Sequence, residues 1–560
     1  MPKMKGYEAA TRMFDGYGVT HIFMVPAVLR RTMVELGEKT EIRRIHCHGE
    51  KSAVYMADGY ARASGRPGIC MAQVIGALNI AAGLRDAWLA HSPVIAMTGG
   101  RDAKTKFRKV YQEIDDMPAF EPVTKFNATV DDVARMPDMI RQAFRAAVTG
   151  CPGPVHLQFR GNEAQLDLDE ADMDPYVEEM FASVPPYRPY PDPAALKQVL
   201  DALQAAERPI IVAGGGVRAS GAQAALVAFA EKLGLPVATS LNGKDAIPGT
   251  NPLSVGVVGT YSRASANQAV NEADLICYIG SETGGMTTHF WQVPPLGTPV
   301  VQIDIEGENI GRNYPLKASV QADAKIALET MVEMADGSGP RKRNAWLSRV
   351  AEINAAWRTE YDGLLNSDAE PIRPERICNE LTKHMPDDAV VAVDTGHGGM
   401  WMGGMFDLKS PNQSYIRSAG HLGWAFPAGM GAKAAKPDRP VVTFTGDAGF
   451  WYHIGELETA VRWGLNSITL VNNNHSGNQS KRGFDRVYGG KQPPKGLELW
   501  TYRETNFARL AEDIGAVGLR VEKPGDIGGA IDKALAVKDR PVIIDVTTDI
   551  EALAPLAVTE

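Results

Sequence analysis

The sequence predicts an α/β fold built from three doubly wound parallel-sheet domains. Short apolar runs that begin with proline recur along the chain and alternate with longer segments of helical period, such as residues 137–148 and 222–233. Such runs are typical of strands buried on both faces, and their alternation with helices is typical of parallel sheets. A chain of 560 residues has room for about three domains. The six runs are residues 93–97, 154–159, 209–213, 299–303, 440–444 and 541–546.

Two irregular stretches indicate where the domains meet. Residues 185–193 hold five prolines in nine positions, which is too stiff for a sheet interior and typical of a spacer. Residues 336–343 are polar and turn-rich, and a helical pattern over residues 344–365 follows them. We therefore expect domains over residues 1–184, 194–335 and 368–560.

Composition excludes several classes of function. With 44% hydrophobic and 22% charged residues the chain resembles an ordinary globular protein, and its formal net charge of -9 offers no broad basic surface to nucleic acid or an anionic membrane. The five cysteines are scattered without a CxxC pair, so neither a disulfide framework nor a zinc site is indicated. The N-terminus lacks the apolar segment of a signal peptide. We expect a cytoplasmic protein with no nucleic-acid or membrane partner.

The segment that begins at Gly446 is the most informative one for chemistry. It reads as a strand ending in a Gly-rich turn, then a helix, then a second strand ending in three asparagines. Asp447 follows the first strand, and the small residues Gly446, Ala448 and Gly449 let backbone N–H groups approach an anion. Asn474 lies 27 positions after Asp447 and follows the second strand. Both side chains can converge at one sheet edge, where their oxygens suit Mg²⁺.

This segment resembles the GDG-to-NN motif of thiamine diphosphate enzymes, with Ala448 in place of the second glycine of the motif. The resemblance implies that Asp447, Asn474 and the backbone carbonyl of Ser476 hold Mg²⁺ on the diphosphate of the cofactor. Taken alone, a Gly-Asp pair near a strand end can be only a turn, and a run of asparagines only a loop. The predicted cofactor-binding set from this domain is completed by His397, Gly446, Gly449 and His475.

A second match lies in residues 48–65, which resemble the family segment in which a glutamate precedes a helix that ends in GYAR. By position this glutamate is Glu50, and the resemblance implies that it hydrogen-bonds N1′ of the aminopyrimidine. That chemistry needs a carboxyl group shielded from water and able to share a proton. Taken alone, a glutamate at a helix start is more often a residue that favours the helix dipole.

A third match is residues 420–427, which resemble the family stretch G-T-M-G-F-G-L-P. The resemblance implies that the Gly420 carbonyl accepts a hydrogen bond from the 4′-amino group and that Leu422 wedges between the two rings of the cofactor, a proximity effect. The alternative is a helix start rich in small residues. His421 replaces a small hydroxyl residue and is a candidate for proton transfer.

The central segment resembles the acetohydroxyacid (acetolactate) synthase branch at residues 213–220 and 302–312. In that branch the central domain holds FAD in a structural role, but residues 280–285 depart from its Arg-Phe-Asp-Asp-Arg stretch, so FAD binding stays open. A Gly-rich turn alone is weak evidence. The resemblance covers nearly the whole chain and implies a pocket between the first domain of one subunit and the third domain of its partner. A homodimer or homotetramer is therefore expected.

The substrate pocket is expected to differ from that of a standard synthase. By analogy Val28, Arg30 and Arg31 line its rim, where the arginines either clamp a carboxylate or form a solvated face. Residues 72–79 replace the usual Ser-Gly-Pro-Gly stretch and place Gln73 near the reacting carbon, and residues 478–482 are polar where synthases carry an apolar pair. The predicted catalytic residues are Glu50, Gln73, Gln112 and His421, and His453, His475 and Gln479 are further candidates for proton transfer.

Together these patterns predict a thiamine diphosphate- and Mg²⁺-dependent lyase or carboligase that acts on a 2-oxo acid, a dicarbonyl or an aldehyde. No His-His dipeptide occurs in the chain, which disfavours simple decarboxylation. Within the family, a diketone C–C hydrolase or a 2-hydroxyacyl-CoA lyase remains an alternative. A non-catalytic, nucleotide-binding regulatory paralogue is an alternative from another class, and the presence of Glu50, Asp447 and Asn474 argues against it.

Overall fold

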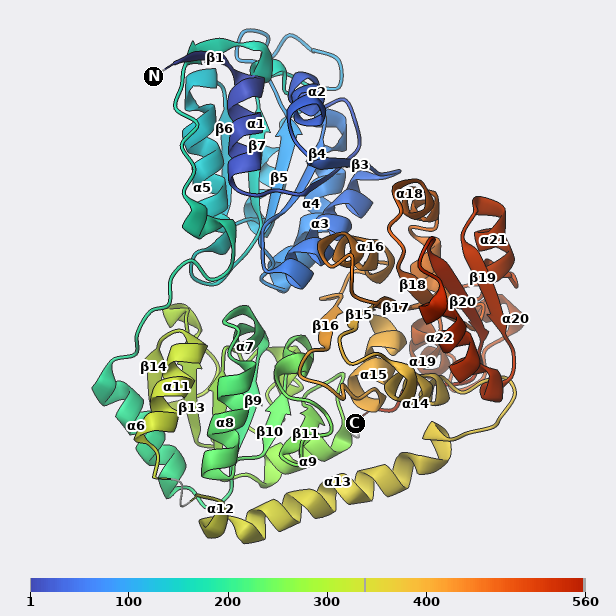
Figure 1. Cartoon of the computed structure of the whole chain (residues 1–560). Coiled ribbons are helices and arrows are strands. Elements are labelled where there is room, and N and C mark those ends of the chain that lie inside the picture. Colours follow the sequence, from blue (N-terminus) through green and yellow to red (C-terminus); the bar gives the residue numbers. More distant parts are fainter. Residues whose placement is uncertain (1, 337–338, 557–560) are drawn as a thin grey trace.

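Three parallel β-sheets of six strands each organise the chain, which is described here by a computed structural model (Figure 1). The structure describes residues 2–336 and 339–556. Helices flank each sheet, so the predicted fold class is confirmed. Each of the six proline-led runs is a buried strand, which confirms those predictions as well.

The first domain is the upper one in Figure 1, and its sheet has the order β3-β2-β4-β5-β7-β6. A small antiparallel pair, β1 with β8, joins the N-terminus to the end of the domain. The strands are β1 (Lys3–Lys5), β2 (His21–Met24), β3 (Arg43–His46), β4 (Gly68–Ala72), β5 (Val94–Gly99), β6 (Phe126–Val130), β7 (Val155–Phe159) and β8 (Glu170–Asp172). The helices are α1 (Gly6–Gly16), α2 (Arg30–Lys39), α3 (Glu50–Ser64), α4 (Ala77–Leu89) and α5 (Met136–Val148), with short 3₁₀ turns at η1 (Val74–Gly76) and η2 (Met117–Ala119).

The central domain has the strand order β11-β10-β9-β12-β13-β14. Numbered along its own sheet this is 3-2-1-4-5-6, the order of dinucleotide-binding domains, with the topological switch between β9 and β12. Its strands are β9 (Pro209–Ala213), β10 (Val237–Thr239), β11 (Ser254–Val257), β12 (Leu275–Ile279), β13 (Val300–Asp304) and β14 (Leu316–Gln321). Its helices are α6 (Pro193–Ala205), α7 (Gly215–Ala219), α8 (Gln223–Leu233), α9 (Ala264–Glu272), α10 (Gly285–Thr288), α11 (Ala324–Met334) and α12 (Gly339–Lys342).

The third domain follows the long helix α13 (Asn344–Leu365), which crosses from the central domain and matches the predicted helical stretch (Figure 1). Its strands are β15 (Val390–Val393), β16 (Ser414–Arg417), β17 (Val441–Gly446), β18 (Ile468–Asn473), β19 (Val517–Val521) and β20 (Val542–Thr547). Its helices are α14 (Pro374–His384), α15 (Gly396–Met405), α16 (Ala425–Ala435), α17 (Asp447–Trp451), α18 (Glu456–Trp463), α19 (Gln479–Val487), α20 (Pro494–Leu497), α21 (Phe507–Ile514) and α22 (Ile527–Ala536).

The first and third domains share one topology. The third sheet has the order β16-β15-β17-β18-β20-β19, so each sheet, numbered along itself, reads 2-1-3-4-6-5. In both domains the helix after the second strand, α3 or α16, lies where the two domains meet, and these two equivalent helices pack against each other. Their backbones approach closely at Gly59 and Gly431, where an added Cβ would overlap the carbonyl oxygens of Ala428 and Met56.

Because of this close approach, we expect Gly431→Ala to lower the unfolding free energy by about 2 kcal/mol or more, through overpacking that the rigid backbone of α3 cannot relieve. The matched control is Gly363→Ala on α13, where the new Cβ meets no atom within 4 Å. That change should instead stabilise the helix by about 0.5–1 kcal/mol. Differential scanning calorimetry of both variants checks the opposite signs, and equal shifts would contradict the packing argument.

A neutral histidine is built into the first core. His156 on β7 is fully buried, stacks on Phe120 with ring centroids 3.5 Å apart, and shares hydrogen bonds of 2.8 Å with Thr98 Oγ1 and Asn127 Oδ1. Burial lowers its pKa to about 3. The folded-state pKa thus lies below the unfolded value of about 6.5, so the unfolded chain binds the proton first as pH falls.

The contribution of His156 to stability should therefore be complete above pH 6.5 and be lost as the pH falls toward 3, at up to about 1.4 kcal/mol per pH unit. We expect thermal unfolding of the wild type to show this acid loss and His156→Gln to show a shallower dependence. An identical slope in the variant would contradict the prediction.

Among the described residues, no helix is both long and apolar enough to cross a membrane.

Candidate active site

An oxygen-rich cluster lies at the carboxyl edge of the third sheet. β17 ends at Gly446, and Asp447, which is 2% exposed, begins the short helix α17. The backbone N–H of Ser476 donates to Asp447 Oδ2 at 2.8 Å, and the Ser476 hydroxyl donates to Asn474 Oδ1 at 2.8 Å. The structure therefore brings together the three residues that the sequence predicts as metal ligands.

The three consecutive asparagines have different surroundings. Asn472 pairs with Gly446 across the sheet. The next side chain turns to the opposite face, where Asn473 Nδ2 donates to Asp545 Oδ1 at 2.8 Å. Asn474 follows the end of β18 and accepts from the hydroxyl of Ser476, whose N–H donates to Asp447. These different partners select Asn474 rather than Asn473 as the amide of the cluster.

Asp447 is a buried carboxyl group whose hydrogen-bond donors are backbone N–H groups, including that of Ser476. Burial raises its pKa to about 7, against the opposing effect of these hydrogen bonds. Nowhere in residues 2–336 and 339–556 do three or more His, Cys, Asp and Glu side chains form a group that could hold a metal. A cation here would combine one carboxylate with neutral oxygens, which suits Mg²⁺ bound together with phosphate oxygens.

Unpaired polar atoms of mostly buried side chains accompany the cluster. The His397 and His475 Nδ1 atoms and the Asn472 and Asn478 Oδ1 atoms have no hydrogen-bond partner in the structure. Burial lowers the pKa of His397 to about 4, so its imidazole is neutral and can donate from one nitrogen. Unpaired buried groups are costly unless a ligand or water satisfies them. These donors and acceptors therefore fit a bound diphosphate and its cation.

A buried carboxylate, Asp394, holds the turn that carries Leu422. Asp394 follows β15 and accepts from the Gly423 N–H at 3.1 Å through each of its two oxygens, and from Thr445 Oγ1 at 2.8 Å. Burial raises its pKa to about 6. Asp394 thereby ties the turn to the ends of both β15 and β17, and Leu422 in this turn is half-buried.

Asp86, a carboxylate of the first domain, fixes the other end of the same turn. Asp86 Oδ2 accepts from the His421 N–H at 3.1 Å and from Ser418 Oγ at 3.0 Å, and its Oδ1 accepts from Arg62 at 2.9 Å. Arg62 belongs to the GYAR end of α3. Gly420 lies between these anchors, is exposed, and has open space where a side chain would be. The turn is therefore rigid and its carbonyl edge is accessible.

Glu50 begins α3 and is half-buried. Its Oε2 accepts from Asn79 Nδ2 at 3.1 Å. Its Oε1 lies against Gly76, where an added Cβ would be 2.6 Å away. Gln73 precedes η1, the turn that contains Gly76, so the sequence-predicted pair Glu50 and Gln73 belongs to one side of the first domain. The glycine permits the close approach that positions the carboxyl group.

His421 pairs with an aromatic residue that the sequence reasoning did not identify. Its Nδ1 shares a hydrogen bond with the buried Tyr55 hydroxyl on α3, and burial lowers the His421 pKa. Tyr55 also packs edge-on against His453, whose Nδ1 shares a hydrogen bond of 2.8 Å with Ser52 Oγ. Two of the predicted proton-transfer candidates, His421 and His453, thus contact the same tyrosine.

Other predicted positions lie elsewhere. Gln112 lies in the long connection between β5 and η2, in left-handed backbone at φ 64°. Gln479 begins α19, and its Nε2 donates to the Tyr261 hydroxyl of the central domain at 3.3 Å. No contact with Glu50 or Asp447 is seen for either residue within residues 2–336 and 339–556. Their predicted catalytic roles therefore stay predictions.

The predicted cation-lined rim looks different in the structure. Val28 is buried in the first core. Arg30 forms an ion pair with Glu163 at 2.8 Å, and Arg31 lies over the Tyr7 ring and 3.3 Å from Glu35. These arginines are paired on the start of α2, which agrees with the solvated-face interpretation and not with a free carboxylate clamp.

Comparison with known proteins identifies the family to which this chain belongs. Three family models match the chain: the "Thiamine pyrophosphate enzyme, N-terminal TPP binding domain" over residues 4–119, the central domain over residues 196–331, and the "C-terminal TPP binding domain" over residues 394–546. The chain belongs to the thiamine pyrophosphate enzyme family. Its branch is the acetolactate synthase-like one, as the relatives show.

Three relatives illustrate this branch. The probable acetolactate synthase large subunit of Methanocaldococcus jannaschii is 30% identical over 99% of this chain and 93% of the relative. The glyoxylate carboligase of Escherichia coli O157:H7 is 30% identical over 98% of this chain and 93% of the relative. The acetolactate synthase large subunit of Haemophilus influenzae is 29% identical over 98% and 95%. The resemblance predicted from the motifs is confirmed, and this protein is a thiamine diphosphate-dependent enzyme.

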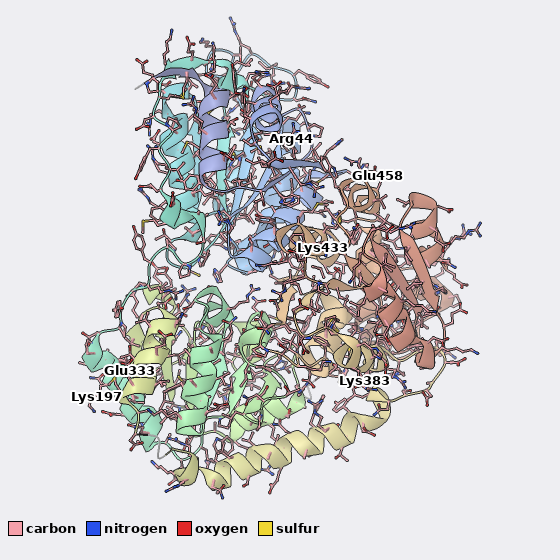
Figure 2. All side chains as sticks on the ribbon, viewed as in Figure 1. Arg44, Lys197, Glu333, Lys383, Lys433 and Glu458 are labelled. Carbon is pink, nitrogen blue, oxygen red and sulfur yellow. The ribbon has the colours of Figure 1, made fainter. Side chains whose placement is uncertain are left out.

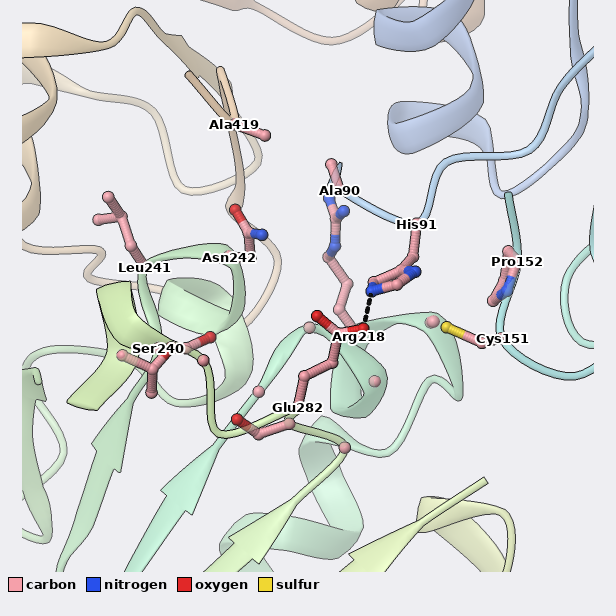
Figure 3. A pocket seen from close by; sticks show the side chains of 18 of the residues that line it. Ala90, His91, Cys151, Pro152, Arg218, Ser240, Leu241, Asn242, Glu282 and Ala419 are labelled. Carbon is pink, nitrogen blue, oxygen red and sulfur yellow. Dashed lines mark ion pairs between the residues drawn. The ribbon is translucent and has the colours of Figure 1, made fainter. Parts of the chain in front are cut away.

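This thiamine diphosphate enzyme has a further cavity of about 450 Å³ where its first and central domains and the β16 segment of its third domain meet (Figure 3). The Gly-rich turn at residues 214–216 and Gly280 form its floor, at the carboxyl ends of β9 and β12. Arg218 also lines it and has an unpaired Nη1 atom, and burial lowers its pKa. The cavity lies at the topological switch of the central sheet, where nucleotides bind in such sheets.

Sequence reasoning missed Asp394, Asp86 and Tyr55, which fix the turn at residues 420–423 in this enzyme. Asp394 could have been noticed, because it directly follows a buried strand, as Asp447 does. Asp86 and Tyr55 lie inside helical patterns, and their contacts span more than three hundred residues of sequence. No local signal marks such contacts.

Proposed function

We propose that this enzyme uses thiamine diphosphate and Mg²⁺ to break and form C–C bonds next to the carbonyl of a 2-oxo acid or a related dicarbonyl. The observation that carries the proposal is the cluster at the carboxyl edge of the third sheet, in which a buried carboxyl group is joined through one serine to a buried amide. Family membership supports the cofactor, and the cluster supports the metal.

The residues of the third domain fit the diphosphate end. Asp447, Asn474 and the carbonyl of Ser476 would hold Mg²⁺, while Gly446, Ala448, Gly449, His397 and His475 would face the phosphates. When bound, thiamine diphosphate would supply the electron sink that C–C cleavage needs. Asp394 accepts from the Gly423 N–H and would so hold the turn in which Leu422 and the carbonyl of Gly420 meet the cofactor.

Glu50 would exchange a proton with the pyrimidine ring of the cofactor. The hydrogen bond from Asn79 orients its carboxyl group, and the position of Oε1 against Gly76 keeps that oxygen partly shielded from water. A shielded carboxyl group in a fixed orientation can hold or release a proton at a heteroaromatic nitrogen. His421, positioned by Tyr55 and by Asp86, is proposed as a second proton carrier.

Two copies of the chain would complete the pocket. Large apolar side chains are exposed beside both half-sites: Ile75 is 54% exposed near Glu50, and Trp451 and Tyr452 are 41% and 58% exposed on the helix and turn after Asp447. Exposed apolar groups of this size favour a protein contact. A homodimer or homotetramer would cover them, and sedimentation at low micromolar concentration measures its presence.

The cavity of the central domain is proposed to bind a nucleotide, with FAD as the first candidate. The strand order, the Gly-rich turn and the unpaired Arg218 support a nucleotide with a diphosphate. The absorption spectrum of the purified protein decides between FAD and a colourless nucleotide.

The experiment that tests the proposed activity is product analysis by mass spectrometry. The purified enzyme is incubated with thiamine diphosphate, Mg²⁺ and a panel of 2-oxo acids, 1,2-diketones and aldehydes. A ligated product identifies a carboligase, whereas two acids or an acid and an aldehyde identify a hydrolase or lyase. The absence of any C–C cleavage or ligation across the panel would reject the proposal.

A further inference from the structure

A thiol, an imidazole and a carboxylate converge on the rim of the central cavity, away from the thiamine site. Cys151 lies in the loop between α5 and β7, His91 follows α4, and Glu282 follows β12 of the central domain. Figure 3 shows the His91 ring between the Glu282 carboxylate and the Cys151 sulfur. The three side chains come from three segments and two domains, so the fold and not local sequence brings them together.

The contacts form a chain from carboxylate to thiol. His91 Nε2 lies 3.0 Å from Glu282 Oε1. Burial acts against a charged ring, but hydrogen bonds to Cys151 and Glu282 outweigh it and raise the pKa of His91 to about 10. The hydrogen bond from His91 in turn lowers the pKa of Glu282. His91 has left-handed backbone at φ 53°, an uncommon conformation that directs the ring toward the cavity rim.

Charged groups of both signs surround Cys151 and His91. Lys125 Nζ donates to the Cys151 carbonyl at 2.6 Å, and burial lowers the pKa of this lysine. Arg312 interacts electrostatically with Glu282. The acidic Asp304 interacts in the same way with His91, and Glu306 with Lys125. Burial raises the pKa of Asp304 to about 6, so this carboxyl group adds little negative charge under mildly acidic conditions.

Cys151 also differs from every other cysteine of the chain. Cys47, Cys70, Cys277 and Cys378 are fully buried, and burial raises the pKa of each of these four thiols. Cys151 is only partly buried, and its neighbours His91 and Glu282 have side chains that are 38% and 47% exposed. A small molecule that enters the cavity can therefore reach this sulfur and the neighbouring imidazole.

We propose that Cys151 is a nucleophilic modification site that forms mixed disulfides with low-molecular-weight disulfides, with His91 as the proton carrier and Glu282 as the group that orients it. A thiol beside an imidazole that a carboxylate orients is the arrangement of activated cysteines. The site lies on the cavity rim, so a modified Cys151 places the added group inside the cavity.

The step is balanced without another reactant. The thiol proton passes to solvent, because His91, with its pKa raised to about 10, already carries its own proton at pH 7, and the Cys151 sulfur attacks one sulfur of the disulfide. The S–S bond of the small molecule breaks, an S–S bond to Cys151 forms, and the departing half leaves as a thiolate that His91 protonates. Cys151 is oxidised, and one half of the disulfide is reduced to a free thiol.

The first test is alkylation of the purified full-length protein with iodoacetamide at pH 7, followed by peptide mass spectrometry. Cys151 should react at least about tenfold faster than any of the other four cysteines. In His91→Ala the Cys151 rate should fall by about tenfold, to that of an ordinary exposed thiol.

Glu282→Gln keeps the shape of the cluster and should slow Cys151 by about threefold, which gives a second measurement if His91→Ala does not fold. The control is His384→Ala, which breaks a histidine–carboxylate pair with Asp532 on the third domain and should leave the Cys151 rate unchanged. With oxidised glutathione, one glutathionyl group should appear on Cys151 and none on Cys151→Ser. Equal labelling of all five cysteines, an unreactive Cys151, or wild-type rates in both cluster variants would overturn the proposal.

Discussion

Glu50→Gln is expected to lower turnover by about 10²- to 10⁴-fold, the usual contribution of a positioned proton-transfer group. Glutamine is nearly isosteric with glutamate, so Asn79 can still hydrogen-bond its carbonyl oxygen and the turn at Gly76 need not move. The affinity for thiamine diphosphate should therefore stay within about threefold of the wild-type value, because the change removes proton exchange and keeps the contacts. Steady-state kinetics and calorimetry on the same preparation measure the two effects separately.

Glu333→Gln is the control for this prediction. Glu333 lies on α11 at the outer side of the central domain, far from both half-sites (Figure 2), and the same chemical change there should leave kcat and binding unaltered. If Glu50→Gln turned over at a rate near that of wild type while it bound the cofactor, Glu50 would be a residue of the helix start and not of the reaction. If it lost the cofactor altogether, its role would be in binding.

How far the fold follows from local sequence is clear from its strands. Proline-led apolar runs predict β5, β7, β9, β13, β17 and β20 because a strand buried on both faces must be apolar throughout. The pattern does not predict that the first and third sheets share the order 2-1-3-4-6-5. Strand order depends on pairings between distant segments, and a buried strand carries no mark of its neighbours.

Local sequence likewise predicts some residues of the site and not others. Asp447 was predictable because it directly follows a buried strand and precedes small residues. Three consecutive asparagines could not be told apart by spacing alone, and only their contacts in the fold, Asn473 with Asp545 and Asn474 with Ser476, distinguish them. Arg30 and Arg31 show the converse, because their pattern suggests a carboxylate clamp while their partners, Glu163 and Glu35, lie on the protein itself.

Contacts with α18 of the third domain hold the segment just before Glu50. His48 and Gly49, just before Glu50, donate backbone hydrogen bonds of 3.0 and 3.1 Å to Glu456 on α18. His48 Nε2 also lies 2.7 Å from Glu458, at the junction visible in Figure 2. The start of α3 is therefore fixed to the third domain of the same chain, and movement of one domain against the other would displace Glu50.

Asp447→Ala is expected to abolish the Mg²⁺-dependent part of thiamine diphosphate binding, with a loss of about 10- to 100-fold or more in apparent affinity. Asp447 is the carboxylate of the cluster, and Asn474 and the Ser476 carbonyl offer only neutral oxygens, which hold Mg²⁺ weakly without an anionic partner. The measurement is calorimetric titration with thiamine diphosphate in Mg²⁺ and again in EDTA. The wild type should respond strongly to EDTA, and the variant should not.

Asp447→Asn separates charge from geometry. Asparagine can still accept the hydrogen bond from the Ser476 N–H, so the strand ends should keep their arrangement, but the buried negative charge is gone. Removing a buried charge that no cation compensates should leave the cofactor-free protein at least as stable as the wild type. Its metal-dependent binding should still fall to the level of Asp447→Ala. Asp438→Asn, an exposed change just before β17, is the matched control and should behave as wild type. If Asp447→Asn bound the cofactor with wild-type affinity and wild-type sensitivity to EDTA, the metal would have to be held elsewhere.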